Sequence, residues 1–150
     1  MAELIGVHHL ALTVSDARRS AEWYRRVLGL MVIGEFDEDA GARHKVILTD
    51  PDSTLLIGLV EHRGGAAGQF DERRAGLDHV AFTVGGQARL AALAARLDRL
   101  GVPRSRIAPA TLDPRNAVLV FRDPDNIQLE FFAVLVDEPV AARFSNREEN

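Results

Sequence analysis

Two stretches of the chain, GVHHLALTVSD (6–16) and GLDHVAFTVGG (76–86), decide the interpretation of the fold because the second repeats the first. Each alternates apolar residues with small or polar ones at the period of two that predicts a β-strand. Each also carries a histidine at the same place, His9 and His79, which are 70 residues apart. A single buried histidine is usually a core residue with a satisfied hydrogen bond. A histidine at the same place in two similar stretches indicates that both have the same role.

The repeat continues beyond these stretches with small changes of spacing. The offset is 72 residues between Gly29 and Gly101, and 73 residues between the two DPD sequences at 50–52 and 123–125. An ordered series of matches with a slow drift is typical of two copies of one structural unit that differ in loop length.

A helix pattern follows the first strand in each copy, over 15–30 and over 86–102. Ser15 is the expected N-cap of the first helix, and Gly29 and Gly101 are the expected stops. Apolar residues recur at helical spacing along one stripe of each helix, which we interpret as core. These stripes consist of Ala17, Ala21, Tyr24 and Leu28 in the first copy and Leu90, Leu93, Leu97 and Leu100 in the second.

Three further strand patterns complete each copy, and the last two are joined by a DPD turn. Proline presets φ in such a turn, and the Ser53 or Asn126 that follows tolerates the next position. The further strands are expected over 30–36, 43–49 and 54–62 in the first copy and over 106–111, 116–122 and 127–134 in the second.

The predicted fold class is therefore α+β: two tandem βαβββ modules that form a curled, cup-like mixed sheet with the helices outside. A four-stranded sheet can cover only one of its faces with one helix, so the other face must curl or pack on its twin. We expect a single domain over 1–150, with its parts bounded as follows: a first module over 5–62, a linker over 63–75, a second module over 76–135 and a polar C-terminal tail over 136–150.

Composition narrows the function classes. The chain has 47% apolar and 27% charged residues, as ordinary globular proteins do, and its net charge of −4 gives no reason to expect nucleic acid or a membrane surface as a partner. It contains no cysteine, which excludes disulfides, thiolate metal sites and a cysteine nucleophile. Neither a signal-peptide pattern nor a long apolar run is present, so we expect a cytoplasmic protein.

Alternation along the first strands gives the histidines a distinctive setting. His9 shares its strand face with Ala11 and Thr13, and the second copy repeats this combination around His79. The bulky apolar residues lie on the opposite face, where a helix can bury them. Each histidine is therefore expected on a concave face with room left beside it.

The last strand of the second copy adds an acid, Glu130, within an apolar pattern. A buried carboxylate is costly unless it is paired or bound to a cation. If Glu130 faces the same concavity as His9 and His79, the three form a set of two histidines and one carboxylate, which suits a divalent first-row metal. Taken one at a time, each of these residues is more often structural; their equivalent places in a repeat favour a metal site.

These residues and motifs resemble those of the vicinal oxygen chelate superfamily, which includes glyoxalase I, bleomycin-resistance proteins, extradiol dioxygenases, fosfomycin-resistance transferases and methylmalonyl-CoA epimerase. The resemblance covers residues 5–134 and lies in HHLALTVSD, WYRRVLGL, DHVAFTV and FRDPDNIQLEFF. It implies paired βαβββ modules around a metal that chelates adjacent oxygens of the substrate. It also implies that His9, His79 and Glu130 are the metal ligands.

The chain departs from the patterns of particular members. Where glyoxalase I has a further carboxylate, this sequence has Ile57 or Gly58, and Glu61 lies too far along the strand to replace it without a register change. Val120 stands where extradiol dioxygenases and fosfomycin transferases carry a tyrosine, and Val118 where fosfomycin transferases use a serine. The resemblance therefore supports a general metalloenzyme more than any one of these activities.

Other candidates near the expected cup have two interpretations each. His44 could line the pocket as a base or substrate contact, or lie on the surface of its strand. Arg73 or Arg74 could contact an anionic substrate, or belong to a solvated linker. His62 is expected on a loop, and His8 points away from His9.

We therefore expect a divalent-metal-dependent enzyme, of dioxygenase, isomerase, lyase or transferase type, acting on a small substrate with adjacent oxygens. Its catalytic residues would be Glu130 and His44, and its ion Fe²⁺ or Mn²⁺, with Zn²⁺, Ni²⁺ or Mg²⁺ as alternatives. A homodimer is the expected assembly. The alternative is a metal-free protein that sequesters a small molecule, as bleomycin-resistance proteins do.

Overall fold

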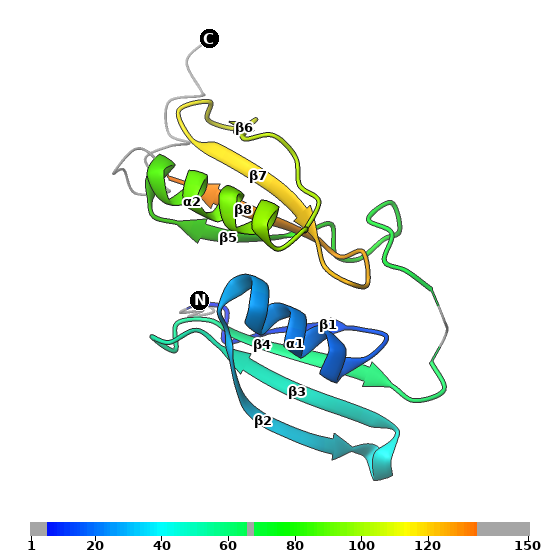
Figure 1. The fold of residues 1–150 in the computed structure, drawn as a ribbon. Coiled ribbons are helices and arrows are strands. Elements are labelled where there is room, and N and C mark those ends of the chain that lie inside the picture. Colours follow the sequence, from blue (N-terminus) through cyan, green and yellow to red (C-terminus); the bar gives the residue numbers. More distant parts are fainter. Residues whose placement is uncertain (1–5, 66–67, 135–150) are drawn as a thin grey trace, which may run out of the picture. The chain divides into compact units, whose positions relative to one another are not determined.

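The computed structural model describes residues 6–65 and 68–134 of the chain. It contains two copies of a βαβββ unit, which confirms the predicted repeat and fold class (Figure 1). The elements in chain order are β1 (Leu10–Thr13), α1 (Ala17–Leu28), β2 (Met31–Glu38), a 3₁₀ turn (Asp39–Gly41), β3 (Arg43–Thr49), β4 (Leu56–His62), β5 (Val80–Val84), α2 (Gly86–Arg99), β6 (Ala108–Pro109), β7 (Ala117–Arg122) and β8 (Gln128–Ala133).

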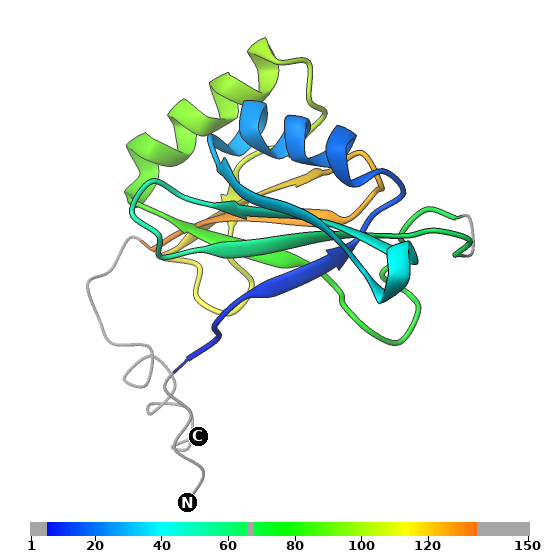
Figure 2. The same ribbon diagram turned by 90° about the horizontal axis from the view of Figure 1, so that it is seen from below.

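The two four-stranded sheets have the same topology. Their strand orders are β1-β4-β3-β2 and β5-β8-β7-β6. The first strand of each copy pairs in parallel with the last strand of that copy, and neither sheet is closed. In Figure 2 each helix lies on one side of the sheet of its own module.

By its contacts the chain divides into two compact units. The described residues of the first are 6–65, 68–76 and 122–127, and those of the second are 77–121 and 128–134. The turn between β7 and β8 thus makes its contacts in the first unit. There the carboxylate of Asp125 accepts hydrogen bonds from the Ser15 amide at 3.1 Å and the Ser20 hydroxyl at 3.2 Å.

The core of each unit lies between its helix and one face of its sheet, because the apolar stripe of the helix meets the alternating apolar residues of the strands. In the first unit Tyr24 of α1 is buried with Leu48 and Leu59. In the second unit Leu97 of α2 is buried with Leu129. The interpretation of the helical stripes as core is confirmed for most of their residues, whereas Leu28, Leu93 and Leu100 are half-buried.

Local residue chemistry explains where the elements begin and end. The N-cap of α1 is Asp16, whose side chain accepts a hydrogen bond from the Arg19 amide at 2.9 Å, so the expectation of Ser15 as the cap was wrong by one residue. A carboxylate is a strong N-cap acceptor, and Ser15 instead accepts from the Arg19 side chain. Gly29 ends the helix with φ of 77°, as predicted.

Both DPD turns have the predicted mechanism. Ser53 and Asn126 adopt positive φ, at 56° and 69°. The amides of Ser53 and Asn126 donate to the carbonyls of Asp50 and Asp123 at 3.0 and 3.1 Å, which closes each turn. The two hairpins therefore have the same local geometry at equivalent places of the repeat.

Some strands are shorter than predicted. β1 starts at Leu10, where parallel pairing with Ile57 begins, so His9 lies in the segment just ahead of the strand. β6 is limited to Ala108 and Pro109, although the amide of Ala110 also donates to the carbonyl of Asn116 at 3.0 Å. In the described part of the chain, no helix is long and apolar enough to cross a membrane.

Candidate metal-binding residues

In the second module, the structure brings together two of the three predicted metal ligands. His79 directly precedes β5, and Glu130 lies on β8 opposite Ala81 in the parallel register. Ala81 is exposed, whereas Val80 and its partner Leu129 are buried on the helix side. Glu130 therefore faces away from α2, on the side of small residues, as alternation along the strands predicts.

The carboxylate of Glu130 is half-buried in this position. Burial raises its pKa above the ordinary value, and the charge of His79 acts in the opposite direction. No hydrogen bond to this carboxylate is made by any residue within 6–65 or 68–134. An acid that loses water without gaining a protein donor is stabilised by a nearby cation.

His79 is held by the residue before it. Its Nδ1 lies 2.6 Å from Oδ1 of Asp78. Because a carboxylate only accepts hydrogen bonds, a neutral His79 carries its proton on Nδ1 and leaves the lone pair of Nε2 available. Asp78 was not among the residues that the sequence pattern singled out, although an acid directly before a candidate ligand histidine was a visible signal.

The first module repeats this arrangement with two differences. His9 is exposed in the segment before β1, and its Nδ1 lies 2.9 Å from Nδ1 of His8. The expectation that His8 points away from His9 was therefore wrong, because strand alternation begins only at Leu10. Ala11 pairs with Gly58 as Ala81 pairs with Glu130, so Gly58 is the structural equivalent of the acid. The sequence left Ile57 and Gly58 as alternatives; Ile57 is fully buried on the other face.

The three predicted ligands are divided between the two units. His9 belongs to the first, and His79 and Glu130 belong to the second. Within either unit taken by itself, the described residues include no group of three or more His, Asp or Glu side chains arranged to hold a metal ion. The complete ligand set therefore stays a prediction.

His44, the other predicted catalytic residue, lies on β3 among carboxylates. It is 7% exposed; its Nδ1 is 2.7 Å from Oδ1 of Asp37 and its Nε2 is 3.2 Å from Oε1 of Glu35. The hydrogen bond with His44 is the main reason why the pKa of Asp37 is lowered. His44 thus has a clear structural partner.

The register puts His44 on the helix side of its sheet. His44 pairs with Glu61 on β4, and the Glu61 carboxylate accepts a 3.1 Å hydrogen bond from the amide of Ala17 at the start of α1. Ala11 and Gly58 lie on the opposite face. This position differs from the expected pocket wall, because strand alternation fixes which residues share a face but not which face turns toward the helix. A catalytic role for His44 stays a prediction.

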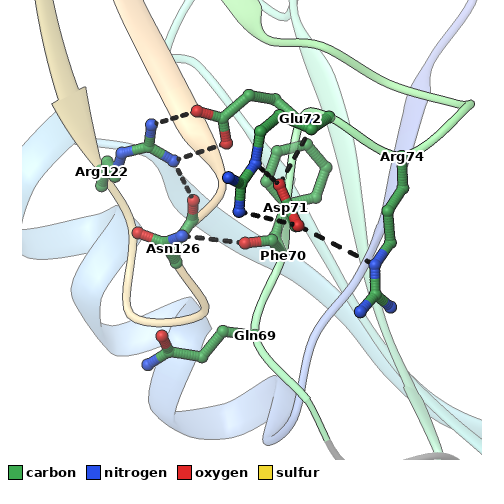
Figure 3. Close-up of a pocket in the computed structure, with 8 residues that line it drawn as sticks. Gln69, Phe70, Asp71, Glu72, Arg74, Arg122 and Asn126 are labelled. Carbon is green, nitrogen blue, oxygen red and sulfur yellow. Dashed lines mark hydrogen bonds and ion pairs between the residues drawn. The ribbon is translucent and has the colours of Figure 1, made fainter.

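The linker contributes a cavity of about 500 Å³ against the β7–β8 turn (Figure 3). The guanidinium of Arg122 donates two hydrogen bonds to Glu72, at 2.7 and 3.1 Å, and one to the carbonyl of Asn126 at 2.8 Å. Arg73 likewise donates to Asp71 at 2.9 Å. Arg122 and Arg73 are thus paired with carboxylates of the linker, and the side chain of Arg73 is 87% exposed, which supports the interpretation of this stretch as a solvated linker.

A second cavity of the first unit, about 610 Å³, adjoins the ends of β1 and β4. His62 ends β4 and is exposed, in place of the predicted loop position. Thr13, which shares the face of Ala11, lines this cavity together with His62 and Arg74. The side chain of Arg74 is 84% exposed and lies 3.9 Å from Asp71.

Comparison with known proteins identifies the family. The family model described as Glyoxalase/Bleomycin resistance protein/Dioxygenase superfamily matches residues 6–131. The chain belongs to this superfamily. The chain is also 30% identical to the uncharacterized protein YwkD of Bacillus subtilis (strain 168) over 129 residues, which covers 86% of this chain and 97% of YwkD.

Solved structures agree with the superfamily assignment. A glyoxylase/bleomycin resistance protein/dioxygenase domain from Frankia sp. EAN1pec is 34% identical, with a TM-score of 0.80, and the match covers 91% of this chain and 96% of that domain. The fosfomycin resistance protein FosX of Listeria monocytogenes, in complex with Mn(II) and sulfate, shares the fold at 19% identity. Its TM-score is 0.65, and the match covers 90% of this chain and 97% of FosX.

Proposed function

We propose that this superfamily member is a divalent-metal-dependent enzyme that acts on a small substrate with adjacent oxygen atoms. His9, His79 and Glu130 would hold the ion. The observation that carries the proposal is the position of Glu130, a half-buried carboxylate that faces the small-residue side of its sheet. Burial raises the pKa of Glu130, and the charge of His79 lowers it. A bound cation would offset the cost of burying this charge.

The donor set fits a first-row metal. Two imidazole nitrogens and one carboxylate leave coordination positions open, and this combination suits Fe²⁺ or Mn²⁺, with Zn²⁺, Ni²⁺ and Mg²⁺ as alternatives. Gly58 supplies no fourth ligand at the place equivalent to Glu130. The presence of Mn(II) in the FosX structure supports the choice of metal by fold likeness alone.

The chain's own residues would provide binding and room for the substrate. When bound, the ion acts as a Lewis acid that polarises a substrate oxygen or stabilises enolate-like charge. The small side chains of Ala11 and Ala81 leave space beside the two histidines, and Glu130 would orient the ion. His44 is the other proposed catalytic residue, and its contacts with Asp37 and Glu35 on the helix side of its sheet also support a role in stability.

Elemental analysis of protein purified without chelators tests this proposal. We expect one equivalent of a divalent metal, its loss in Glu130→Ala, and its retention in Glu22→Ala, an exposed glutamate on α1 that serves as the matched control. Full metal occupancy in Glu130→Ala would contradict the assignment. Substrates with vicinal oxygens, assayed with and without dioxygen, would then separate dioxygenase from isomerase, lyase or transferase chemistry.

A second candidate function is metal-free binding of a small molecule, like that of bleomycin-resistance proteins. The half-buried position of Glu130 on the small-residue side of its sheet also suits this alternative, because a carboxyl group there can hydrogen-bond to a ligand without any ion. Absence of metal from protein that still binds a small molecule would select it. For either function we propose a homodimer, which light scattering after size-exclusion chromatography would measure.

A further inference from the structure

The residue before each predicted histidine ligand contacts that histidine through Nδ1. This applies to Asp78 before His79 and to His8 before His9, which are equivalent positions of the repeat. We propose that Asp78 and His8 are positioning residues that keep Nε2 of His79 and His9 free and aimed for metal binding. The inference rests on the proposed metal function, and it concerns how the ligands are prepared before the ion arrives.

Asp78 selects the tautomer of His79 through its hydrogen-bonding chemistry. The carboxylate can only accept, so the 2.6 Å contact requires the proton of a neutral His79 to be on Nδ1. The alternative tautomer, with the proton on Nε2, would block the nitrogen that is left to bind an ion. The same contact also limits rotation of the imidazole ring, which reduces the entropy lost when the ligand is fixed.

His8 constrains its neighbour less strongly, because an imidazole nitrogen can either donate or accept. At 2.9 Å one of the two Nδ1 atoms donates to the other. In the proposed direction His9 is the donor, since this direction leaves its Nε2 unprotonated. A neutral imidazole is a poorer acceptor than a carboxylate. We therefore expect His79 to be the better prepared of the two ligands.

A purely structural role does not explain these contacts. The side chain of Asp78 is 70% exposed, and His8 is exposed as well. Among the residues that the structure describes, Asp78 makes its one side-chain hydrogen bond to His79. Exposed pairs between neighbours in sequence contribute little to stability. The effect of these contacts would be on the tautomer and orientation of the histidine.

Two measurements on the full chain test the inference. Long-range ¹H–¹⁵N spectra of the metal-free protein report which nitrogen of each histidine is protonated, and calorimetry with Mn²⁺ alone reports affinity. Asp78→Ala is expected to shift His79 toward the Nε2–H tautomer and to weaken Mn²⁺ binding about tenfold, the low end for such partners because Asp78 is exposed. Asp78→Asn, which retains an acceptor oxygen, should restore most of both properties.

Two more variants sharpen the result. Asp98→Ala removes an aspartate of α2 whose ion pair with Arg104 lies at 2.8 Å, and as the matched control it should change neither tautomer nor affinity. His8→Asp gives the first copy the acceptor of the second, and it should tighten Mn²⁺ binding several-fold. A smaller loss is expected for His8→Ala than for Asp78→Ala.

The outcomes separate the inference from the proposed function. Wild-type protein that binds no Mn²⁺ overturns the metal proposal and this inference with it. Wild-type protein that binds Mn²⁺, together with unchanged tautomer and affinity in Asp78→Ala, overturns the positioning role alone. A tautomer shift with weaker binding in Asp78→Ala, both restored in Asp78→Asn, supports the positioning role. Thermal unfolding of Asp78→Ala is the control, because a general loss of folding would lower its unfolding temperature.

Discussion

The hydroxyl of Tyr24 donates a 3.1 Å hydrogen bond to Oδ2 of Asp123, although the two residues are 99 positions apart in the chain. Both side chains are buried. Burial raises the pKa of Asp123 from 3.8 to about 6, while the amides of Ile127 and Asp125 and the Tyr24 hydroxyl act against this rise. The second DPD turn is thus tied to α1 through an acid that titrates near neutral pH.

Stability should depend on the protonation of Asp123. Because its folded pKa is above its unfolded value, the folded state holds the proton more tightly, and this contribution is present below about pH 4 and is lost as the pH rises to 6. Asp123→Asn should remove a pH-dependent term on the order of 2 kcal/mol. Urea unfolding at pH 4 and pH 7 measures it.

Asp50→Asn is the matched control for this prediction, because Asp50 has the equivalent place in the first turn. A hydrogen bond from the Leu55 amide lowers the pKa of Asp50, so its contribution is lost as the pH falls. The two variants should therefore change the pH dependence in opposite senses. The same pH profile for Asp123→Asn and wild type would contradict the assignment.

Removing the phenol hydroxyl should weaken the same contact from the other side. Tyr24→Phe keeps the buried ring but leaves Oδ2 of Asp123 without this donor, which should cost about 1–2 kcal/mol of unfolding free energy. The pKa of Asp123 should rise further, because the lost hydrogen bond favoured its charged form. Carboxyl carbon shifts measured by NMR against pH report this pKa. An unchanged titration would show that the hydrogen bond does not form in solution.

His44→Gln separates a structural from a catalytic role. The imidazole lies on the helix side of its sheet beside Asp37 and Glu35, so the variant should lose stability, by about 1 kcal/mol, and keep its metal content. The pKa of Asp37 should rise toward its ordinary value, so the free energy of unfolding should decrease less as the pH falls into the acidic range. His62→Gln, at an exposed histidine, is the control. Loss of metal in His44→Gln, with its stability retained, would favour a place in the site.

Gly58→Glu would add a carboxylate at the position equivalent to Glu130. A Cβ added at Gly58 would have Cδ1 of Ile47 as its nearest neighbour, at 3.5 Å. This is an ordinary van der Waals distance, so the first carbon of a new side chain fits there. If the three-ligand proposal holds, the variant should bind Mn²⁺ about tenfold more tightly and have fewer open positions for substrate. Calorimetry measures the affinity, with Gly58→Ala as control. No change in affinity would argue against an ion beside Gly58.

Much of the fold was predictable because it follows from short-range patterns. The period of two placed Ala11 and Thr13 on one face and Leu12 on the other, and the positive φ of Asn126 follows from the chemistry of its turn. Positions that depend on pairing between strands were not predictable. The start of β1 at Leu10 depends on where Ile57 lies beside it.

The candidate site shows the same division. The face of Glu130 was predictable from alternation, and its parallel pairing with Ala81 agrees with that face. The side of the sheet on which His44 lies was not predictable, since it depends on which face α1 covers. Asp78 was missed for another reason: its role depends on a side-chain contact of 2.6 Å that no periodicity describes.

The turn at 122–127 makes the two halves of the chain unequal despite their common pattern. The carboxylate of Asp125 accepts hydrogen bonds from Ser15 and Ser20, which lie in the first copy of the repeat, whereas its counterpart in the first turn, Asp52, is exposed. A fragment ending at Gly76 would lack the acceptors on which α1 relies, so we expect it to be less stable than its half of the repeat suggests. Chimeras in which one turn replaces the other should lose stability for the same reason, because the two similar turn sequences make different contacts.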